Sequence, residues 1–249
     1  LSRIDRLDEK TKSLLKTASV IGRNFYYKVL EEAAQTIEEL DNRLEYLKET
    51  QLLSENRHKE EVEFLFKHAL AQQATYDSII QKTRKELHLK IARSIEKVFA
   101  DKLPEFYGVL AMHYDKAEVT EKKREYLILA GDEAFRSGAS NEAMNFYMEA
   151  IKLFPKVLEG DIEKENFKEL EIKIAFAQKA AGNNIAAIES FQKIILTYFN
   201  YKITDNEFIL KLKGIFGTLL IMLKMNFKSN FFSKEPDEKF NTYMKVLTQ

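Results

Sequence analysis

The hydrophobic positions of this sequence mostly recur at steps of three and four, which places them on one face of an α-helix. Asp8 is typical of a helix N-cap, and Gly22 predicts the end of that first helix. Asn24 predicts the start of a second helix, and a capping box formed by Thr36 and Glu39 predicts the start of a third. The inward-facing positions are Leu14, Leu15, Ala18, Ile21, Phe25, Val29, Leu30, Ala33, Ile37, Leu40, Leu44 and Leu47.

Residues 52–66 follow a different pattern. Val62, Phe64 and Phe66 alternate with Glu63, Leu65 and Lys67, and this alternation of bulky residues is typical of a strand with one buried face. A polar run over residues 56–59 suits a hairpin tip. We expect one β-hairpin only, near Leu52–Glu55 and Val62–Phe66, and helix for at least roughly 60% of the residues. Three helices followed by a hairpin predict a winged-helix domain over residues 1–81.

His68 lies where the alternation ends and a run rich in Ala, Leu and Gln favours a helix. The N-terminus of a helix offers free backbone N–H groups and a partial positive charge, and so favours anions. A histidine at that place can donate a hydrogen bond to a phosphate. The alternatives are that His68 only caps its helix or fills a gap under the wing.

Composition narrows the classes of function. The 249 residues suggest one large or two ordinary domains, and 39 basic and 39 acidic residues give a net charge of zero. The absence of cysteine excludes disulfides and thiolate metal sites, and the histidines at 58, 68, 88 and 113 lack metal-site spacing. No P-loop motif and no catalytic constellation is present. We therefore expect a chain that is not itself an enzyme and holds no cofactor of its own.

The third predicted helix opposes DNA binding. Between Thr36 and Gln51 it carries five acidic residues against Arg43 and Lys48. Residues 1–81 hold 12 basic and 15 acidic side chains, a net charge of −3. Because a helix that enters a DNA groove must approach phosphates, we expect no DNA partner.

Residues 82–120 predict a connector of two helices. Leu87, Ile91, Ile95 and Val98 form the inner face of the first helix. We interpret His88 as a packed surface histidine beside this stripe, and we place His113 on the polar side of the second helix, without a role. The remainder of the chain, residues 121–249, predicts helical repeats.

The repeats resemble the tetratricopeptide pattern, which wants small residues where two helices cross, an aromatic in the second helix and a proline after it. A weaker copy follows, and its turn glycine, Gly182, lies 44 residues after Gly138 instead of 34. The excess lies around Pro155 to Lys164. Such repeats stack into a superhelix whose concave side binds proteins or peptides. The matching positions are Gly131, Gly138, Ala143, Tyr147, Ala150 and Pro155, then Ala175, Gly182, Ala187 and Phe191.

The C-terminal residues 200–249 contain an apolar run from Gly214 to Leu223 that is too short to span a bilayer. We interpret it as a third repeat whose outer partner is missing, with a basic membrane-surface helix as the alternative. Glu235 to Asp237 predicts the start of a last helix. The chain begins with Leu1 and shows no signal peptide, so we expect a fragment of a longer, cytoplasmic protein.

Several blocks resemble the winged-helix domain of bacterial STAND-class signal-transduction ATPases, a branch of the AAA-type fold, in proteins where a class III adenylate or guanylate cyclase or a protein kinase precedes the ATPase. Phe-Lys-His-Ala at residues 66–69 stands where that class commonly has Met-His-Asp, so Ala69 departs from the motif. The resemblance implies that His68 contacts the β-phosphate of ADP bound to a neighbouring ATPase domain. The blocks are residues 18–25, 44–53, 66–76 and 85–99.

The resemblance implies a regulatory, protein-interaction fragment of a multidomain signalling protein. Its partners would be the ATPase domain of the same chain and a protein or peptide on the concave face of the repeats. ATP and ADP would belong to the parent protein. The alternative is the regulatory part of a STAND-type transcription activator or protein kinase.

Overall fold

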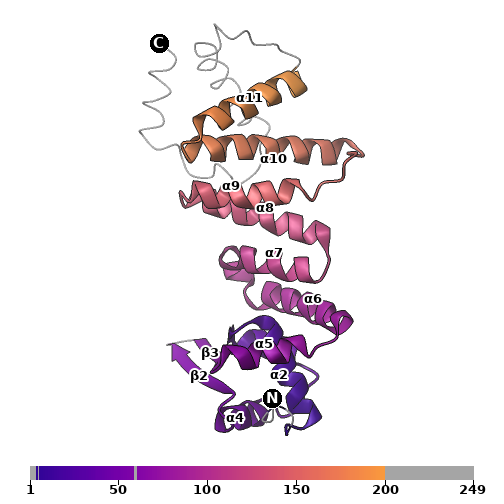
Figure 1. Ribbon diagram of the computed structural model, residues 1–249, viewed down its shortest axis with the longest axis vertical. Helices are drawn as coiled ribbons and strands as arrows, with labels where there is room; N and C mark the ends of the chain where they lie inside the picture. Colours follow the sequence, from indigo (N-terminus) through magenta and orange to yellow (C-terminus); the bar gives the residue numbers. More distant parts are fainter. Residues whose placement is uncertain (1–3, 5, 59–60, 200–249) are drawn as a thin grey trace. The chain divides into compact units, whose positions relative to one another are not determined.

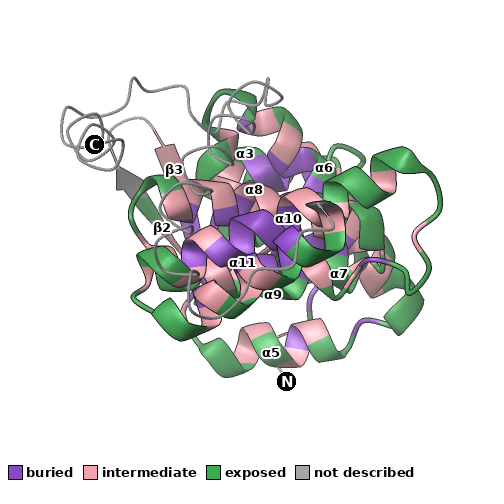
Figure 2. Cartoon of the chain, turned by 90° about the horizontal axis from the view of Figure 1, so that it is seen from above, coloured by how far each residue is buried: buried purple, intermediate pink, exposed green. Residues whose placement is uncertain are grey.

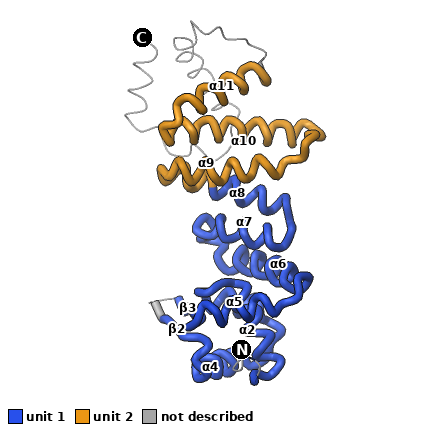
Figure 3. The backbone as a smooth tube through the Cα atoms, in the orientation of Figure 1, with its two compact units in different colours: residues 1–130 blue, residues 131–249 orange. Residues whose placement is uncertain are grey.

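The computed structural model of the protein describes residues 4, 6–58 and 61–199. Helices make up 73% of these residues, which confirms a mainly α fold. The chain forms two compact units, residues 1–130 and 131–249, which are coloured separately in Figure 3. The domain boundaries expected after residues 81 and 120 stay predictions.

Unit 1 holds the small sheet and most of the helices (Figure 1). Its elements, in chain order, are α2 (Glu9–Ile21), β1 (Asn24–Tyr26), α3 (Tyr27–Ala33), α4 (Leu40–Glu49), β2 (Leu53–His58), β3 (Glu61–Phe66), α5 (Ala69–Asp77), α6 (Gln81–Val98), the 3₁₀ helix η1 (Ala100–Phe106), α7 (Tyr107–Lys116) and α8 (Thr120–Arg136), which runs past the end of the unit.

The sheet is antiparallel with strand order β1-β3-β2. The β2–β3 hairpin confirms the expected one. In the structure Leu53 lies opposite Phe66. The expectation of a hairpin alone was wrong, because Asn24 opens the strand β1 and not a helix. Phe25 pairs with Phe64, and the two rings stack with centroids 6.0 Å apart. Burial of Phe25 against the middle strand therefore outweighs its helical spacing to Val29.

Two helix starts were predicted on either side of β1, and the structure confirms one and contradicts the other. Asp8 caps α2, since its Oδ1 accepts the N–H groups of Lys10 at 3.0 Å and Thr11 at 3.1 Å. The capping box of Thr36 and Glu39 was wrong. Helix α4 begins at Leu40, and Glu39 lies before it in the left-handed region with φ 59° and no side-chain cap.

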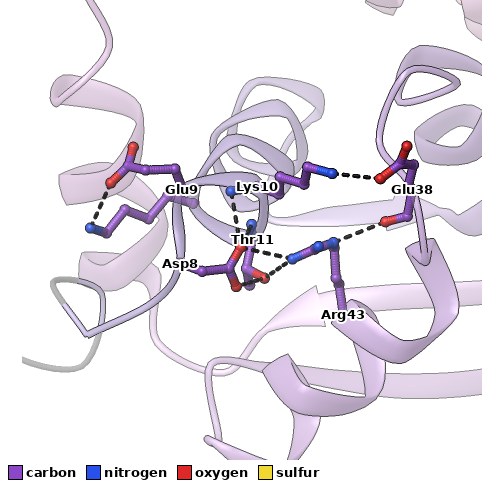
Figure 4. A network of polar contacts seen from close by, with 7 residues as sticks. Asp8, Glu9, Lys10, Thr11, Glu38 and Arg43 are labelled. Atoms are coloured by element: carbon purple, nitrogen blue, oxygen red, sulfur yellow. Dashed lines mark hydrogen bonds and ion pairs between the residues drawn. The ribbon is translucent and has the colours of Figure 1, made fainter.

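A network of polar contacts, and not a capping box, stabilises this turn (Figure 4). Arg43 donates from Nε to the Glu38 carbonyl at 2.9 Å and from Nη1 to Asp8 Oδ1 at 2.8 Å. Lys10 pairs with the Glu38 carboxylate. Hydrogen bonds from the hydroxyl and N–H of Thr11, with Arg43 nearby, lower the pKa of Asp8 to about 2. The start of α2 and the entry to α4 are thus tied together.

The core of unit 1 under the sheet joins α2, α3, α4 and all three strands. Its side chains come from the predicted inward positions, apart from Leu7, Ala34, Leu52 and Leu53. The buried members are Leu7, Leu14, Leu15, Ala18, Phe25, Leu30, Ala34, Leu44, Leu47, Leu52, Leu53, Phe64 and Phe66.

Unit 2 contains the end of α8 followed by α9 (Ser140–Ile151), α10 (Asp161–Ala180) and α11 (Asn184–Phe199). Gly138 with φ 84° and Gly182 with φ 81° make the turns before α9 and α11, as expected, because only glycine enters this region without strain. The link over residues 152–160 and the 20 residues of α10 account for the wide spacing of the two turns.

Helices α8 and α9 approach each other closely at Gly131. A Cβ atom there would lie 2.4 Å from Cε1 of Tyr147, whose ring is fully buried. Small residues were expected at this position and an aromatic one opposite it. A second cluster between α10 and α11 contains Ile172, Ala175, Ala187, Phe191 and Ile194. The chain therefore forms helix pairs with glycine turns, as in a helical repeat.

The predictions for residues 200–249, a third repeat or a membrane-surface helix and a last helix, lie outside the described residues. Among the helices that the structure does describe, none is both long enough and apolar enough to cross a membrane.

Candidate functional site

The junction between β3 and α5 carries the candidate residue. β3 ends at Phe66 and α5 begins at Ala69, which leaves His68 as the residue before the helix, as expected. Its backbone is extended, with φ −123° and ψ 118°. Its carbonyl accepts the N–H groups of Ala71 at 3.0 Å and Gln72 at 3.3 Å, the first bonds of the helix.

The His68 side chain does not cap the helix that follows it. It makes no capping hydrogen bond to α5, and no acidic residue lies in the first turn of the helix. His68 and Ala69 are exposed, and Leu70 is 84% exposed. The His68 side chain therefore neither caps α5 nor fills a gap beneath the hairpin. An exposed ring beside uncapped N–H groups can instead donate to an anion.

Three contacts fix the junction to the rest of unit 1. The Lys67 N–H donates to the Leu52 carbonyl at 3.1 Å, and its Nζ bonds the side chain of Gln51. Gln72 donates from Nε2 to the Ser19 carbonyl at 2.7 Å, which ties α5 to the end of α2. The backbone that presents His68 is thus held by the residues just before β2 on one side and by α2 on the other.

A hollow of about 350 Å³ lies between α3, α4 and the hairpin. Sequence reasoning found the acidic residues of α4 but not the hollow, because it depends on how the hairpin packs against that helix. Its apolar lining is Leu44, Val62 and Phe64, and its polar lining is Tyr27, Asp41, Glu45, Lys48 and Glu55.

The polar side chains of the hollow are paired with one another. Lys48 bridges Glu45 at 2.6 Å and Glu55 at 2.7 Å. The Tyr27 hydroxyl donates to Asp41 at 2.8 Å, and burial together with this carboxylate raises the pKa of Tyr27. Three carboxylates and one ammonium leave the hollow negative, so it repels phosphate.

This charge predicts that the exposed face of α4 does not bind nucleic acid. We expect random duplex DNA at low salt to show undetectable or very weak binding, measured by the fluorescence anisotropy of a labelled duplex. A submicromolar affinity that falls steeply with added salt would contradict the charge argument. The variant Asp41→Lys/Glu45→Lys is the matched comparison, because it reverses the local charge at two exposed positions.

The prediction from the sequence placed two histidines wrongly. His88 is 3% exposed and His113 fully buried, so neither lies on the surface or the polar side. Their Nδ1 atoms are 2.9 Å apart, and His88 Nε2 lies 3.0 Å from the Tyr76 hydroxyl. The available signal was spacing: His88 stands three residues before Ile91 and His113 three after Leu110, on the two buried stripes.

The titratable residues do not form a metal centre in the described ranges, where no group of three or more His, Asp or Glu side chains is placed to hold an ion. His68 is separate from the His88–His113 pair, since it lies at the opposite end of α5 from Tyr76. The arrangement therefore offers one exposed anion donor and one buried polar chain.

Comparison with known proteins is sparse. No family model matches the chain, and no solved structure matches it. Over 122 residues the chain is 28% identical to an uncharacterized protein of Rhizobium meliloti (strain 1021). The match covers 49% of this chain but 12% of that protein, so the chain spans only a small part of the relative's length.

Proposed function

We propose that this chain is a non-catalytic, regulatory part of a multidomain signalling protein with a STAND-type ATPase. The observation that carries the proposal is the place of His68, exposed at an uncapped helix N-terminus directly after a hairpin. In this proposal residues 1–81 are a winged helix that packs on the ATPase domain. His68 donates to the β-phosphate of ADP held by that domain.

Two further observations support the proposal. Phosphate is favoured at a helix N-terminus, and the first turn of α5 carries no acidic residue that would oppose it. The relative in Rhizobium meliloti extends far beyond the matched stretch, as a multidomain protein would. We propose adenylate or guanylate cyclase as the output of the parent protein, with ATP and ADP bound outside this chain.

The helix pairs of unit 2 supply the proposed interaction function. Turn glycines, the Gly131–Tyr147 crossing and buried Ala143 and Ala150 support a tetratricopeptide-like array. Such an array binds a protein or peptide on its concave face. A STAND-type transcription activator or protein kinase would use the same parts, and the domain encoded upstream distinguishes these outputs.

Substitution of His68 tests the nucleotide contact. In the full-length protein we expect His68→Ala to weaken ADP retention by about ten- to a hundredfold, since a hydrogen bond to a charged partner contributes about 1.5–3 kcal/mol. Release of a fluorescent ADP analogue measures this change. The basal output should rise as ADP is lost.

The matched control is Gln73→Ala, at another exposed position of α5. It should leave ADP release unchanged. This chain alone lacks the other half of the site, so it should bind no ADP measurably. Unchanged ADP release in the His68→Ala protein would overturn the nucleotide contact.

A further inference from the structure

A chain of three polar side chains crosses the interior of unit 1 at α5, α6 and α7. Tyr76 comes from α5, His88 from α6 and His113 from α7. The Tyr76 hydroxyl meets His88 Nε2 at 3.0 Å, and the two histidines meet through Nδ1 at 2.9 Å. We name this set the histidine latch. Polar groups buried this deeply carry specific partners, so the latch joins the three helices.

The latch has room for only one proton between the two rings. If Tyr76 donates to His88, then His88 donates from Nδ1 and the proton of His113 is on Nε2. If His88 donates to Tyr76 instead, His113 donates from Nδ1 and its Nε2 is bare. In both arrangements Nε2 of His113 is buried without a partner among the described residues. Uptake of a further proton either points two N–H groups at each other between the rings or puts a positive charge on a buried ring.

The charges around the latch oppose protonation. Arg84 on α6 lies over the Tyr76 ring at 4.3 Å, and Lys116 on α7 acts on His88 with the same sign. Burial first, and then these two cations, lower the pKa of His88 to about 4. Burial and the neighbouring His88 lower the pKa of His113 to about 3.

Three carboxylates on α5, on α7 and just after α7 are engaged with other side chains. Asp77 on α5 accepts from Gln73 at 2.9 Å. Asp115 on α7 pairs with Lys123 at 3.0 Å, and Glu118 pairs with Lys85 at 2.6 Å. The helices α2, α3 and η1 also pack on α6, but within the described residues they place no charge that shifts either histidine. A protonated latch is therefore not neutralised.

Helix α5 is the part of the latch that is held least firmly. It has nine residues, of which only Thr75 is buried, and Figure 2 shows it mostly exposed or half-exposed. Helices α6 and α7 by contrast bury several apolar residues each. Loss of the latch therefore releases α5 before the other two helices. Release also moves His68, which begins the same helix.

We propose that the histidine latch is an acid-sensitive device that fastens α5 to α6 and α7 and opens locally when its histidines take up protons. Both pKa values in the folded state lie below the unfolded value of 6.5. The stabilisation is therefore complete above about pH 6.5 and is lost as the pH falls toward about 4. The open state gains up to about tenfold in population per pH unit for each histidine.

Hydrogen exchange of this chain tests the latch. Protection of the α5 amides is measured from about pH 7.5 to about pH 5, after correction for the intrinsic pH dependence of exchange. We expect the opening equilibrium to rise below about pH 6.5, by up to about tenfold per pH unit for each histidine that the opening exposes to water. Amides of α2 and α10 should keep their protection.

Two variants define the origin of the effect. His88→Gln/His113→Asn keeps amide partners at the hydrogen-bonding positions without a titrating ring, and should flatten the pH dependence at α5. His68→Asn removes an exposed histidine from the same helix and should leave the slope unchanged. Protection of α5 that does not change with pH in the unsubstituted chain would overturn the proposal. Simultaneous loss of protection in α2 and α5 would overturn it as well, since the opening would then be global.

Discussion

Replacing Tyr147 with alanine is expected to lower the free energy of unfolding of unit 2 by about 3–5 kcal/mol. The ring is fully buried and is the largest such side chain of the described residues. Gly131, which lies against the ring, has no side chain that could fill the space the ring leaves. The substitution therefore leaves a cavity where α8 and α9 cross.

Urea denaturation followed by circular dichroism, with hydrogen exchange of α9 and α10 amides to isolate unit 2, measures this loss. The variant Tyr147→Phe is the control. It keeps the ring and removes only the hydrogen bond from the hydroxyl to Asp132, which is 2.7 Å long. That bond contributes about 1–2 kcal/mol. A Tyr147→Ala protein within about 1 kcal/mol of the unsubstituted chain would show that the crossing repacks freely.

A second large effect is expected at the buried ion pair of Asp132 and Lys173. Lys173 is 7% exposed and lies 2.8 Å from Asp132, with Glu169 at 3.2 Å as its weaker partner. Asp132→Leu leaves the ammonium group inside unit 2 without its closest carboxylate. We expect a loss of about 3 kcal/mol, because breaking the shorter of its ion pairs weakens the compensation of a buried charge, although Glu169 stays beside the ammonium group.

The double variant Asp132→Leu/Lys173→Met distinguishes the contribution of charge to stability from that of packing. Replacing both members of a buried pair with apolar side chains of similar volume is often nearly neutral, so most of the lost stability should return. Urea denaturation of the two single variants and the double variant measures the coupling. A double variant as unstable as Asp132→Leu alone would mean that packing, and not charge, holds this part of α10.

The local signals in the sequence predicted those features that depend on a few neighbouring residues. The cap at Asp8, the turns at Gly138 and Gly182 and the junction at His68 all arise from backbone geometry within one or two turns of helix. Such features need no knowledge of the rest of the chain. They place His68 between the end of β3 and the start of α5.

The features that the sequence did not predict depend on partners far along the chain. Strand β1 exists because Phe25 meets Phe64, and the periodicity around Phe25 fits a helix equally well. His88 and His113 are buried with a hydrogen bond between their Nδ1 atoms, although polar side chains are expected outside. The capping box failed since Glu38, one residue earlier, is bound by Lys10 and Arg43.

The contact between Gly131 and Tyr147 also constrains how this protein can diverge. A side chain at position 131 is excluded while position 147 holds an aromatic ring, but not after the ring is lost. Substitution must therefore proceed in one order, with position 147 becoming small before position 131 becomes large. Among homologues, the two positions should covary, and glycine at 131 should persist wherever tyrosine or phenylalanine is retained at 147.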